Sequence, residues 1–167
     1  MKKLIFIILM VAVTPFFSFA QPKTNNQLYV IESIKAYLYL DTKGIFSKDI
    51  TTDFALWNTN IGAGDAESPS HATMVVVKIK RLSQNKTGNR KVRLIVTESG
   101  KMKLNQTIDF SLYDNNYNYY AAFWVYNTGC GLLKLSATII NEKSTLNRQI
   151  NVIESEMKKE INFECGE

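Results

Sequence analysis

Apolar and polar side chains alternate along most of this chain, and this period of two restricts its fold more than any other feature. Successive side chains of a β-strand point to opposite faces of a sheet, whereas a helix repeats every 3.6 residues. The alternating runs are rich in Val, Ile, Tyr, Phe and Thr, the residue types that strands favour. The pattern predicts strands at Ser33–Asp41, Phe54–Asn58, Ala72–Leu82, Lys91–Glu98, Leu104–Leu112, Tyr119–Asn127, Leu132–Asn141 and Glu160–Cys165.

Turn sequences separate these runs. Gly, Asn and Asp tolerate the backbone angles that tight turns need, and they recur between the runs in Thr42-Lys43-Gly44, Asn85-Lys86-Thr87-Gly88-Asn89, Ser99-Gly100 and Asp114-Asn115-Asn116. Many short strands with close turns are typical of two packed antiparallel sheets. We therefore expect an all-β fold, a two-sheet antiparallel sandwich of the immunoglobulin-like type, with a jelly roll as the alternative.

The segment Ser144–Met157 fits two patterns. Ser144 is a residue type that caps helices, and apolar side chains follow it at helical spacing, at Leu146, Ile150, Ile153 and Met157. Ile150 and Val152 also alternate with polar neighbours, as they would in a strand. We favour a strand for this segment and leave the helix open.

The first twenty residues have the composition of a removable secretory leader. Lys2 and Lys3 precede the apolar run Leu4–Phe17, and Ser18-Phe19-Ala20 supplies the small residues that a signal peptidase needs. The run is shorter than the roughly 20 residues that span a bilayer. We expect cleavage after Ala20, a flexible tail over residues 21–27 and one sandwich domain over residues 28–167. The mature chain is then secreted or periplasmic, with no membrane span.

Export changes the expected chemistry of the two cysteines. Oxidising compartments favour disulfides, and a zinc site needs more ligands than Cys130, Cys165 and the single His71 offer. We therefore expect a Cys130–Cys165 bond, and closing its loop of about 36 residues stabilises the fold by roughly 4 kcal/mol. The alternative, Cys130 as a catalytic nucleophile with His71, needs a free thiolate, which a disulfide removes.

The expected strand Tyr119–Asn127 is apolar on both faces. Alternation puts Tyr120, Trp124 and Tyr126 on the face opposite Phe123, and a sandwich core buries only one face. The second set is therefore either covered by neighbouring side chains or exposed as a platform that stacks on sugar rings or accepts a partner's side chains. The candidate binding residues on this platform are Tyr37, Tyr39, Tyr120, Trp124 and Tyr126.

Cationic side chains are concentrated between residues 78 and 103, where Glu98 is the only acidic residue. A face of one sign attracts anionic partners such as acidic glycans, lipid head groups or nucleic acid, although export disfavours nucleic acid. The alternative is a solvated hairpin whose lysines protect exposed sheet edges. If the hairpin binds a partner, the candidate residues are Lys78, Lys80, Arg90 and Arg93.

The longest polar interruption runs from Asn58 to His71. Its carboxylates at Asp65 and Glu67 are weak candidate ligands for calcium, because the spacing of a calcium hand is absent. The glycines of this loop also lack the Lys-Ser/Thr of a phosphate cradle. The alternative is an ordered structural connection. We expect no bound metal and no cofactor.

Four stretches form a further pattern: Leu56-Trp57-Asn58 with the loop that follows, Asn89-Arg90-Lys91-Val92, Phe123-Trp124-Val125-Tyr126-Asn127-Thr128-Gly129-Cys130 and Phe163-Glu164-Cys165-Gly166-Glu167. In these stretches the chain resembles a family of small uncharacterised exported bacterial immunoglobulin-like β-sandwich proteins. The resemblance implies an immunoglobulin-like sandwich and supports the Cys130–Cys165 pairing, but it implies no activity. The stretch from Ser144 to Val152 is longer than the family pattern suggests.

These observations favour a binding protein over an enzyme. One histidine and no Gly-x-Ser-x-Gly turn leave no nucleophile, base and orienting group to combine. The leading hypothesis is an exported, non-catalytic sandwich that binds an unknown envelope or extracellular protein or a glycan. The alternative is a glycan-active or calcium-dependent enzyme centred on residues 58–71.

Overall fold

The computed structural model describes residues 27–53, 55–61, 64–83, 88–112, 116–145 and 148–166. The predicted leader and nearly all of the predicted tail lie outside these residues, as does most of two predicted turns. Every regular element in the described part of the chain is a strand, so the all-β prediction is confirmed. The strands are β1 (Tyr29–Leu40), β2 (Ile45–Phe46), β3 (Leu56–Trp57), β4 (Ala72–Arg81), β5 (Arg90–Glu98), β6 (Lys101–Phe110), β7 (Asn118–Tyr126), β8 (Gly131–Thr145) and β9 (Arg148–Glu164).

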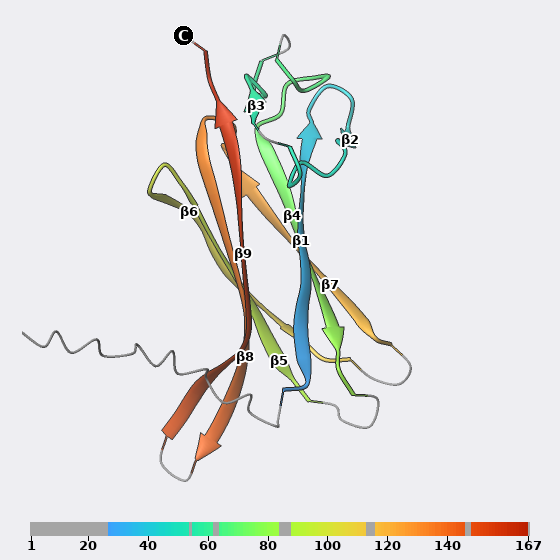
Figure 1. Ribbon diagram of the computed structural model, residues 1–167, viewed down its shortest axis with the longest axis vertical. Helices are drawn as coiled ribbons and strands as arrows, with labels where there is room; N and C mark the ends of the chain where they lie inside the picture. The colour runs from blue at the N-terminus through green and yellow to red at the C-terminus, as the bar shows by residue number, and fades with distance from the viewer. Residues whose placement is uncertain are drawn as a thin grey trace, which may run out of the picture.

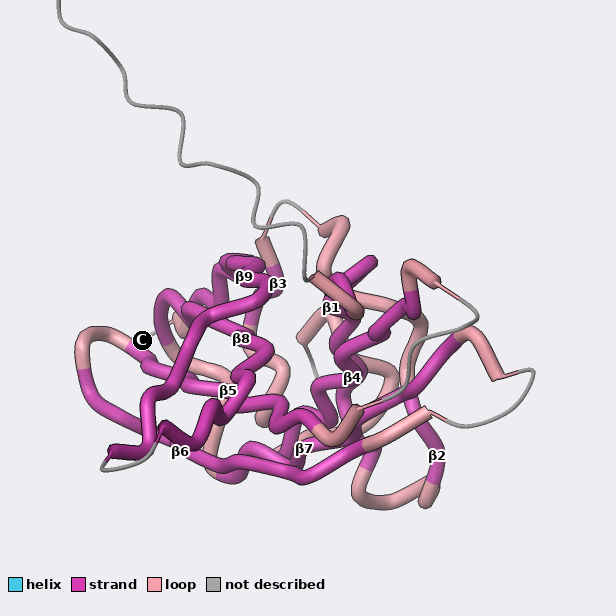
Figure 2. Tube along the Cα trace, turned by 90° about the horizontal axis from the view of Figure 1, so that it is seen from below, coloured by secondary structure: helices cyan, strands magenta, loops and turns pink. Residues whose placement is uncertain are grey.

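The strands form two sheets that face each other. One has the order β2-β1-β4-β7 and the other β3-β9-β8-β5-β6, and the chain crosses between them after β2, β3, β4, β6 and β7 (Figure 1). Figure 2 looks along the long axis and shows the two layers, with β6 beside β7 at one side of the sandwich. A sheet of β1, β4 and β7 facing one of β9, β8, β5 and β6 matches strands A-B-E and G-F-C-C′ of immunoglobulin-like sandwiches. The predicted two-sheet sandwich is therefore confirmed.

The core lies between the sheets and is built by the alternation seen in the sequence. In β5 the inward row Val92, Leu94 and Val96 is fully buried, and in β7 Phe123 is 1% exposed. Rings fill one end of this core, where Tyr29 meets Phe110 edge to face at 5.2 Å between centroids. Burial of these side chains supplies most of the stabilisation of such a fold.

The C-terminal part departs most from expectation. Residues 148–157 belong to a single strand of 17 residues, β9, which pairs with β8 in a long hairpin. The preference for a strand over a helix is thus confirmed for the described residues. The hairpin extends beyond the body of the sandwich (Figure 1), so Ile150 and Ile153 are exposed, whereas Met157 packs against the core.

The tight turn between β5 and β6 was predicted from its residues, Ser99 and Gly100. Ser99 and Gly100 both have positive φ, 48° and 80°, and they connect β5 to β6 as a two-residue hairpin loop. Positive φ at both central residues matches the right-handed twist of the flanking strands, which is why Gly is favoured here. The predicted turn at this point is confirmed.

A disulfide connects the turn before β8 to the end of the neighbouring strand β9. Cys130 and Cys165 are bonded, with their Cα atoms 5.4 Å apart, and the predicted pairing is confirmed. Cys130 lies in the turn that leads from β7 to β8, and Cys165 directly follows β9. In the described part of the chain, no helix has the length and apolar character needed to cross a bilayer.

Candidate aromatic binding face

The outer face of β7 carries large apolar side chains that no other part of the described chain buries. Tyr120 is 59% exposed, Trp124 37% and Tyr126 65%, whereas the inward neighbour Phe123 is almost fully buried. This is the division that alternation predicted. The sequence left open whether these rings are covered by neighbouring side chains or exposed. The sheet puts them on its solvent side, so they form the exposed platform.

Trp124 is the centre of a cluster of rings. Its indole lies 5.7 Å from the ring of Tyr39 on β1 and 5.7 Å from that of Phe46 on β2, measured between centroids. The ring of Tyr126 is nearly parallel to it, at 6.3 Å. We call the exposed outer surface of the β2-β1-β4-β7 sheet the aromatic face, and its rings are Tyr37, Tyr39, Phe46, Tyr120, Trp124 and Tyr126. All five predicted aromatic candidates lie on it, and only Phe46 was missed.

Register explains why residues distant in the sequence meet here. Tyr37 is opposite Met74, and Met74 is opposite Trp124, so these side chains form one row across three strands. Tyr120 lies further along β7, where it lines a shallow depression of about 240 Å³ together with Tyr37. Pairs of this kind are the units by which side chains on one face of a sheet contact each other.

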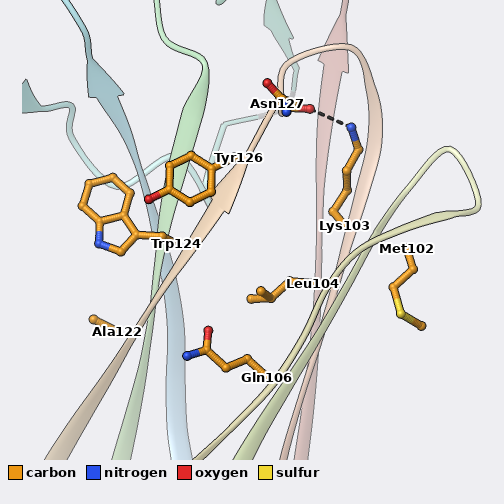
Figure 3. A pocket seen from close by; sticks show the side chains of 8 residues that line it. All are labelled: Met102, Lys103, Leu104, Gln106, Ala122, Trp124, Tyr126 and Asn127. Atoms are coloured by element: carbon orange, nitrogen blue, oxygen red, sulfur yellow. Dashed lines mark hydrogen bonds between the residues drawn. The ribbon is translucent and has the colours of Figure 1, made fainter.

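A groove borders the aromatic face where the edge strands β6 and β7 run beside each other. It has a volume of about 530 Å³ and is lined by Met102, Lys103, Leu104, Gln106, Ala122, Trp124, Tyr126 and Asn127. Figure 3 shows Leu104 and Gln106 reaching from β6 toward β7, with the rings of Trp124 and Tyr126 side by side on β7. At one end the Lys103 ammonium donates to the Asn127 carbonyl oxygen at 2.7 Å and bridges the two strands.

The charges on the aromatic face neutralise one another. Lys78 lies 2.5 Å from a Glu32 carboxylate oxygen, and Lys80 contacts the other oxygen at 3.7 Å. The hydrogen bond from Lys78 holds the pKa of Glu32 below its ordinary value and raises the pKa of Lys78. Lys35 is similarly 3.7 Å from Asp49. These paired groups give the face no strong preference for an anionic or a cationic partner.

The predicted basic hairpin is not a single surface. β4 and β5 belong to different sheets, so Lys78 and Lys80 lie on the aromatic face, while Arg93 lies on the outside of the opposite sheet. Arg90 is not a surface residue, because its side chain is 9% exposed and paired with Glu154. The prediction of one basic face is therefore wrong, since the spacing of cations along a chain does not say which sheet each strand joins.

Both ends of the inward row of β5 carry a paired charge. Arg90 donates to the Glu154 carboxylate, whose Oε1 also accepts the backbone N–H of Tyr29 at 2.9 Å. At the other end the 6% exposed Glu98 accepts from Gly129 N at 3.0 Å and from Lys103 at 2.8 Å. Arg90 and Glu98 are even-numbered, like the buried residues Val92, Leu94 and Val96 of the same strand. Alternation therefore put them on the inward side, and this was the sequence signal for their burial. Glu154 gave no such signal, because a bulge next to it reverses the alternation of β9.

The loop from Asn58 to His71 uses its polar groups within the fold. The Asp65 carboxylate accepts the Trp57 N–H at 2.7 Å, and Glu67 pairs with Lys43 at 2.6 Å, which lowers the pKa of Glu67. His71 Nδ1 lies 2.6 Å from Asp41. Among the described residues no group of three His, Cys, Asp or Glu side chains is arranged to hold a metal ion. These contacts match the interpretation as a structural connection.

Comparison with known proteins leaves the family open. A scan against protein-family models and a search of curated proteins each return no match for this chain. Membership in the family of exported sandwich proteins that the sequence resembles therefore stays a prediction. The case for function rests on the geometry of the aromatic face and of the groove beside it.

Proposed function

We propose that this protein is an exported, non-catalytic binding protein whose aromatic face engages a partner in the cell envelope or the extracellular space. It leaves the cytoplasm on a leader that is cleaved after Ala20. The Cys130–Cys165 disulfide supports this location, because such bonds persist in oxidising compartments.

The exposed ring cluster around Trp124 carries the proposal. Monomeric proteins rarely leave large contiguous apolar patches in contact with water, and those that do use them for binding. Trp and Tyr are also the side chains that most often supply the dominant binding energy at interfaces. The cluster joins residues of β1, β2 and β7, so it is a property of the assembled sheet rather than of one strand.

The proposed partner is uncharged where it contacts this face. The cations nearest to the rings are engaged by Glu32 and Asp49, so they offer little attraction to an acidic ligand. Attraction between exposed charges weakens with salt, whereas burial of apolar surface does not. Binding should therefore persist when the salt concentration is raised.

The test is capture from an envelope and culture-medium extract of the producing cells by immobilised mature protein. Wild-type protein should retain a partner across a salt series, and Trp124→Ala should lose it. Lys134→Ala is the matched control, because Lys134 lies on β8 in the other sheet and is 58% exposed. The proposal would be refuted if Lys134→Ala lost the partner while Trp124→Ala still captured it. It would also be refuted if neither the wild type nor Lys134→Ala captured any partner.

A further inference from the structure

We propose that the groove between β6 and β7 is a subsite for an uncharged sugar ring, which stacks on the indole of Trp124 over Ala122. This inference rests on the proposed binding function and adds the class of ligand. Three features of the groove carry it: an open indole surface, backbone groups without strand partners, and an amide side chain directed toward the same space.

The indole has one neighbour too small to cover it. Side chains two residues apart on a strand lie next to each other on the same face, so Trp124 lies between Tyr126 and Ala122. The Tyr126 ring is tilted by only 13° from the indole and stacks along one side of it. Ala122 on the other side offers only a methyl group, and Trp124 keeps 37% of its surface exposed beside the rings of Tyr39 and Phe46. A flat aromatic surface of this kind provides a large contact area for the apolar face of a sugar ring.

Backbone groups of β7 point into the groove. Asn127 N donates to His71 O at 2.7 Å and Arg81 N to Tyr117 O at 2.8 Å, so the odd-numbered residues of β7 form the hydrogen-bonded pairs with β4. Antiparallel strands alternate these pairs with pairs whose N–H and C=O groups point the other way. The N–H and C=O groups of Ala122, Trp124 and Tyr126 therefore face the open edge, where sugar hydroxyls can both donate and accept.

Gln106 adds a side-chain amide on the opposite wall. Its carboxamide extends toward β7 in Figure 3 and has no hydrogen-bond partner among the described residues. An amide offers two donors and one acceptor, which suits a ligand with several hydroxyl groups. The only ammonium that lines the groove, that of Lys103, is already bonded to Asn127 O and to Glu98. The groove therefore favours an uncharged sugar over an acidic one.

The same geometry disfavours a peptide strand added to β7. An added strand would run along β7 at a spacing of about 4.8 Å, continuously over several residues. Leu104 and Gln106 reach into this space, and the bond between Lys103 and Asn127 crosses it at one end. A ring compound needs no continuous strip along the edge, so it fits the groove where a strand does not.

The test uses Trp124 as its own reporter. The sequence has two tryptophans, so Trp57→Phe leaves Trp124 as the only indole. This protein is titrated with short linear oligosaccharides of neutral hexoses and of N-acetylhexosamines, after a first screen on an array that also holds sulfated and uronic acid glycans. We expect a saturable change in fluorescence with at least one neutral oligosaccharide and no dependence on salt.

Two variants test the position of the sugar. Ala122→Leu puts a larger side chain beside the indole and should weaken binding up to about tenfold, the size of one lost stacking contact. Gln106→Ala should weaken it less. Lys134→Ala is the control, since Lys134 lies on the other sheet and does not line the groove, and it should bind like the parent. Unchanged melting temperatures show that the variants remain folded.

Failure of this inference is distinguishable from failure of the proposed function. Binding of acidic glycans only, unchanged affinity of Ala122→Leu, or no binding of any neutral oligosaccharide would overturn the sugar subsite. If the extract partner is still captured through Trp124 and is destroyed by protease, the binding function stands and its partner is a polypeptide. If Trp124→Ala captures the partner as well as wild type does, the function itself is refuted.

Discussion

The outer faces of the two sheets expose different kinds of side chain to water. On the β3-β9-β8-β5-β6 sheet, charges of opposite sign stand across from each other on neighbouring strands. Lys134 lies 3.2 Å from Glu160, and Lys91 lies 2.8 Å from Glu142. On the β2-β1-β4-β7 sheet, aromatic rings occupy the centre of the face. The first sheet also exposes single apolar side chains, such as Met102 and Ile153, but in the described residues only the second gathers exposed rings into a cluster.

The difference is the basis of the proposal that the aromatic face binds a partner. Cross-strand pairs of opposite charge keep a sheet face solvated and contribute modestly to stability. Exposed Trp and Tyr side chains contribute less to stability than buried ones and raise the risk of association. The cost of exposing these rings is what a binding role, as proposed above, would explain.

The largest expected contrast is between neighbours on β7. Phe123→Ala removes a ring that is 1% exposed in the core and should cost about 3–5 kcal/mol of unfolding free energy. Trp124→Ala removes a ring that is 37% exposed and should cost about 2 kcal/mol, the size of its three lost ring contacts. Urea unfolding of both variants measures the difference. Equal losses would mean that the aromatic face is part of the structural core.

A second large effect concerns the buried pair of Arg90 and Glu154 within one sheet, because Glu154 also accepts the N–H of Tyr29 on β1 of the other sheet. Glu154→Ala leaves Arg90 unpaired and the Tyr29 N–H without its acceptor, so it should cost about 3 kcal/mol. Glu154→Gln keeps an acceptor oxygen but not the charge, and its loss should be intermediate. Chemical unfolding measures both variants. Equal stability of Glu154→Ala and the wild type would show that this pair does not hold the first strand.

A smaller effect, which depends on pH, concerns Asp49 at the margin of the aromatic face. Burial alone raises its pKa, but hydrogen bonds from Thr51 and the Ala36 N–H outweigh this and hold the pKa below its ordinary value. A carboxyl whose pKa is lowered by folding stabilises the fold above its ordinary pKa and loses this effect as the pH falls through the lowered value.

Asp49→Asn should therefore cost about 1 kcal/mol near neutral pH, and the difference from wild type should shrink in acid. Urea unfolding at a series of pH values measures it. A difference that grew as the pH fell would contradict the assignment of the ionised carboxylate as the acceptor.

The smallest effect is expected on the charged face. Lys134→Ala or Glu160→Ala should change the unfolding free energy by less than about 1 kcal/mol, because both side chains are 58% exposed and the pair is screened by salt. A double-mutant cycle at low and high salt isolates the pair. A coupling that survives high salt would show that this face is more than a solvated surface.

Much of the fold followed from alternation alone. The ranges expected from Ser33, Ala72, Lys91 and Tyr119 onward coincide with β1, β4, β5 and β7 to within a few residues, since each strand has one buried side. The two-residue strand β2 was missed, because a period cannot be recognised in two residues. The length of β9 was underestimated, since its pairing with β8 beyond the sandwich body leaves apolar residues such as Ile153 exposed.

The candidate site was predictable only in part. Alternation divided Trp124 from Phe123, but the placement of Phe46 beside Trp124 and of Gln106 across the groove depends on how strands from distant parts of the chain assemble. The same reason explains the error over the basic residues. Arg90 and Lys78 are close in the sequence. Arg90 is buried at the end of the core, whereas Lys78 lies on the outer surface of the other sheet.

The central claim, that the aromatic face is open in the free protein, is tested most directly by quenching of Trp124 fluorescence. In Trp57→Phe protein a neutral quencher such as acrylamide should reach the indole readily, and a bound partner should shield it. The expected result is efficient quenching of the free protein that falls when the captured partner is added. An indole that is shielded in the free protein, or equally accessible with and without the partner, would contradict the account.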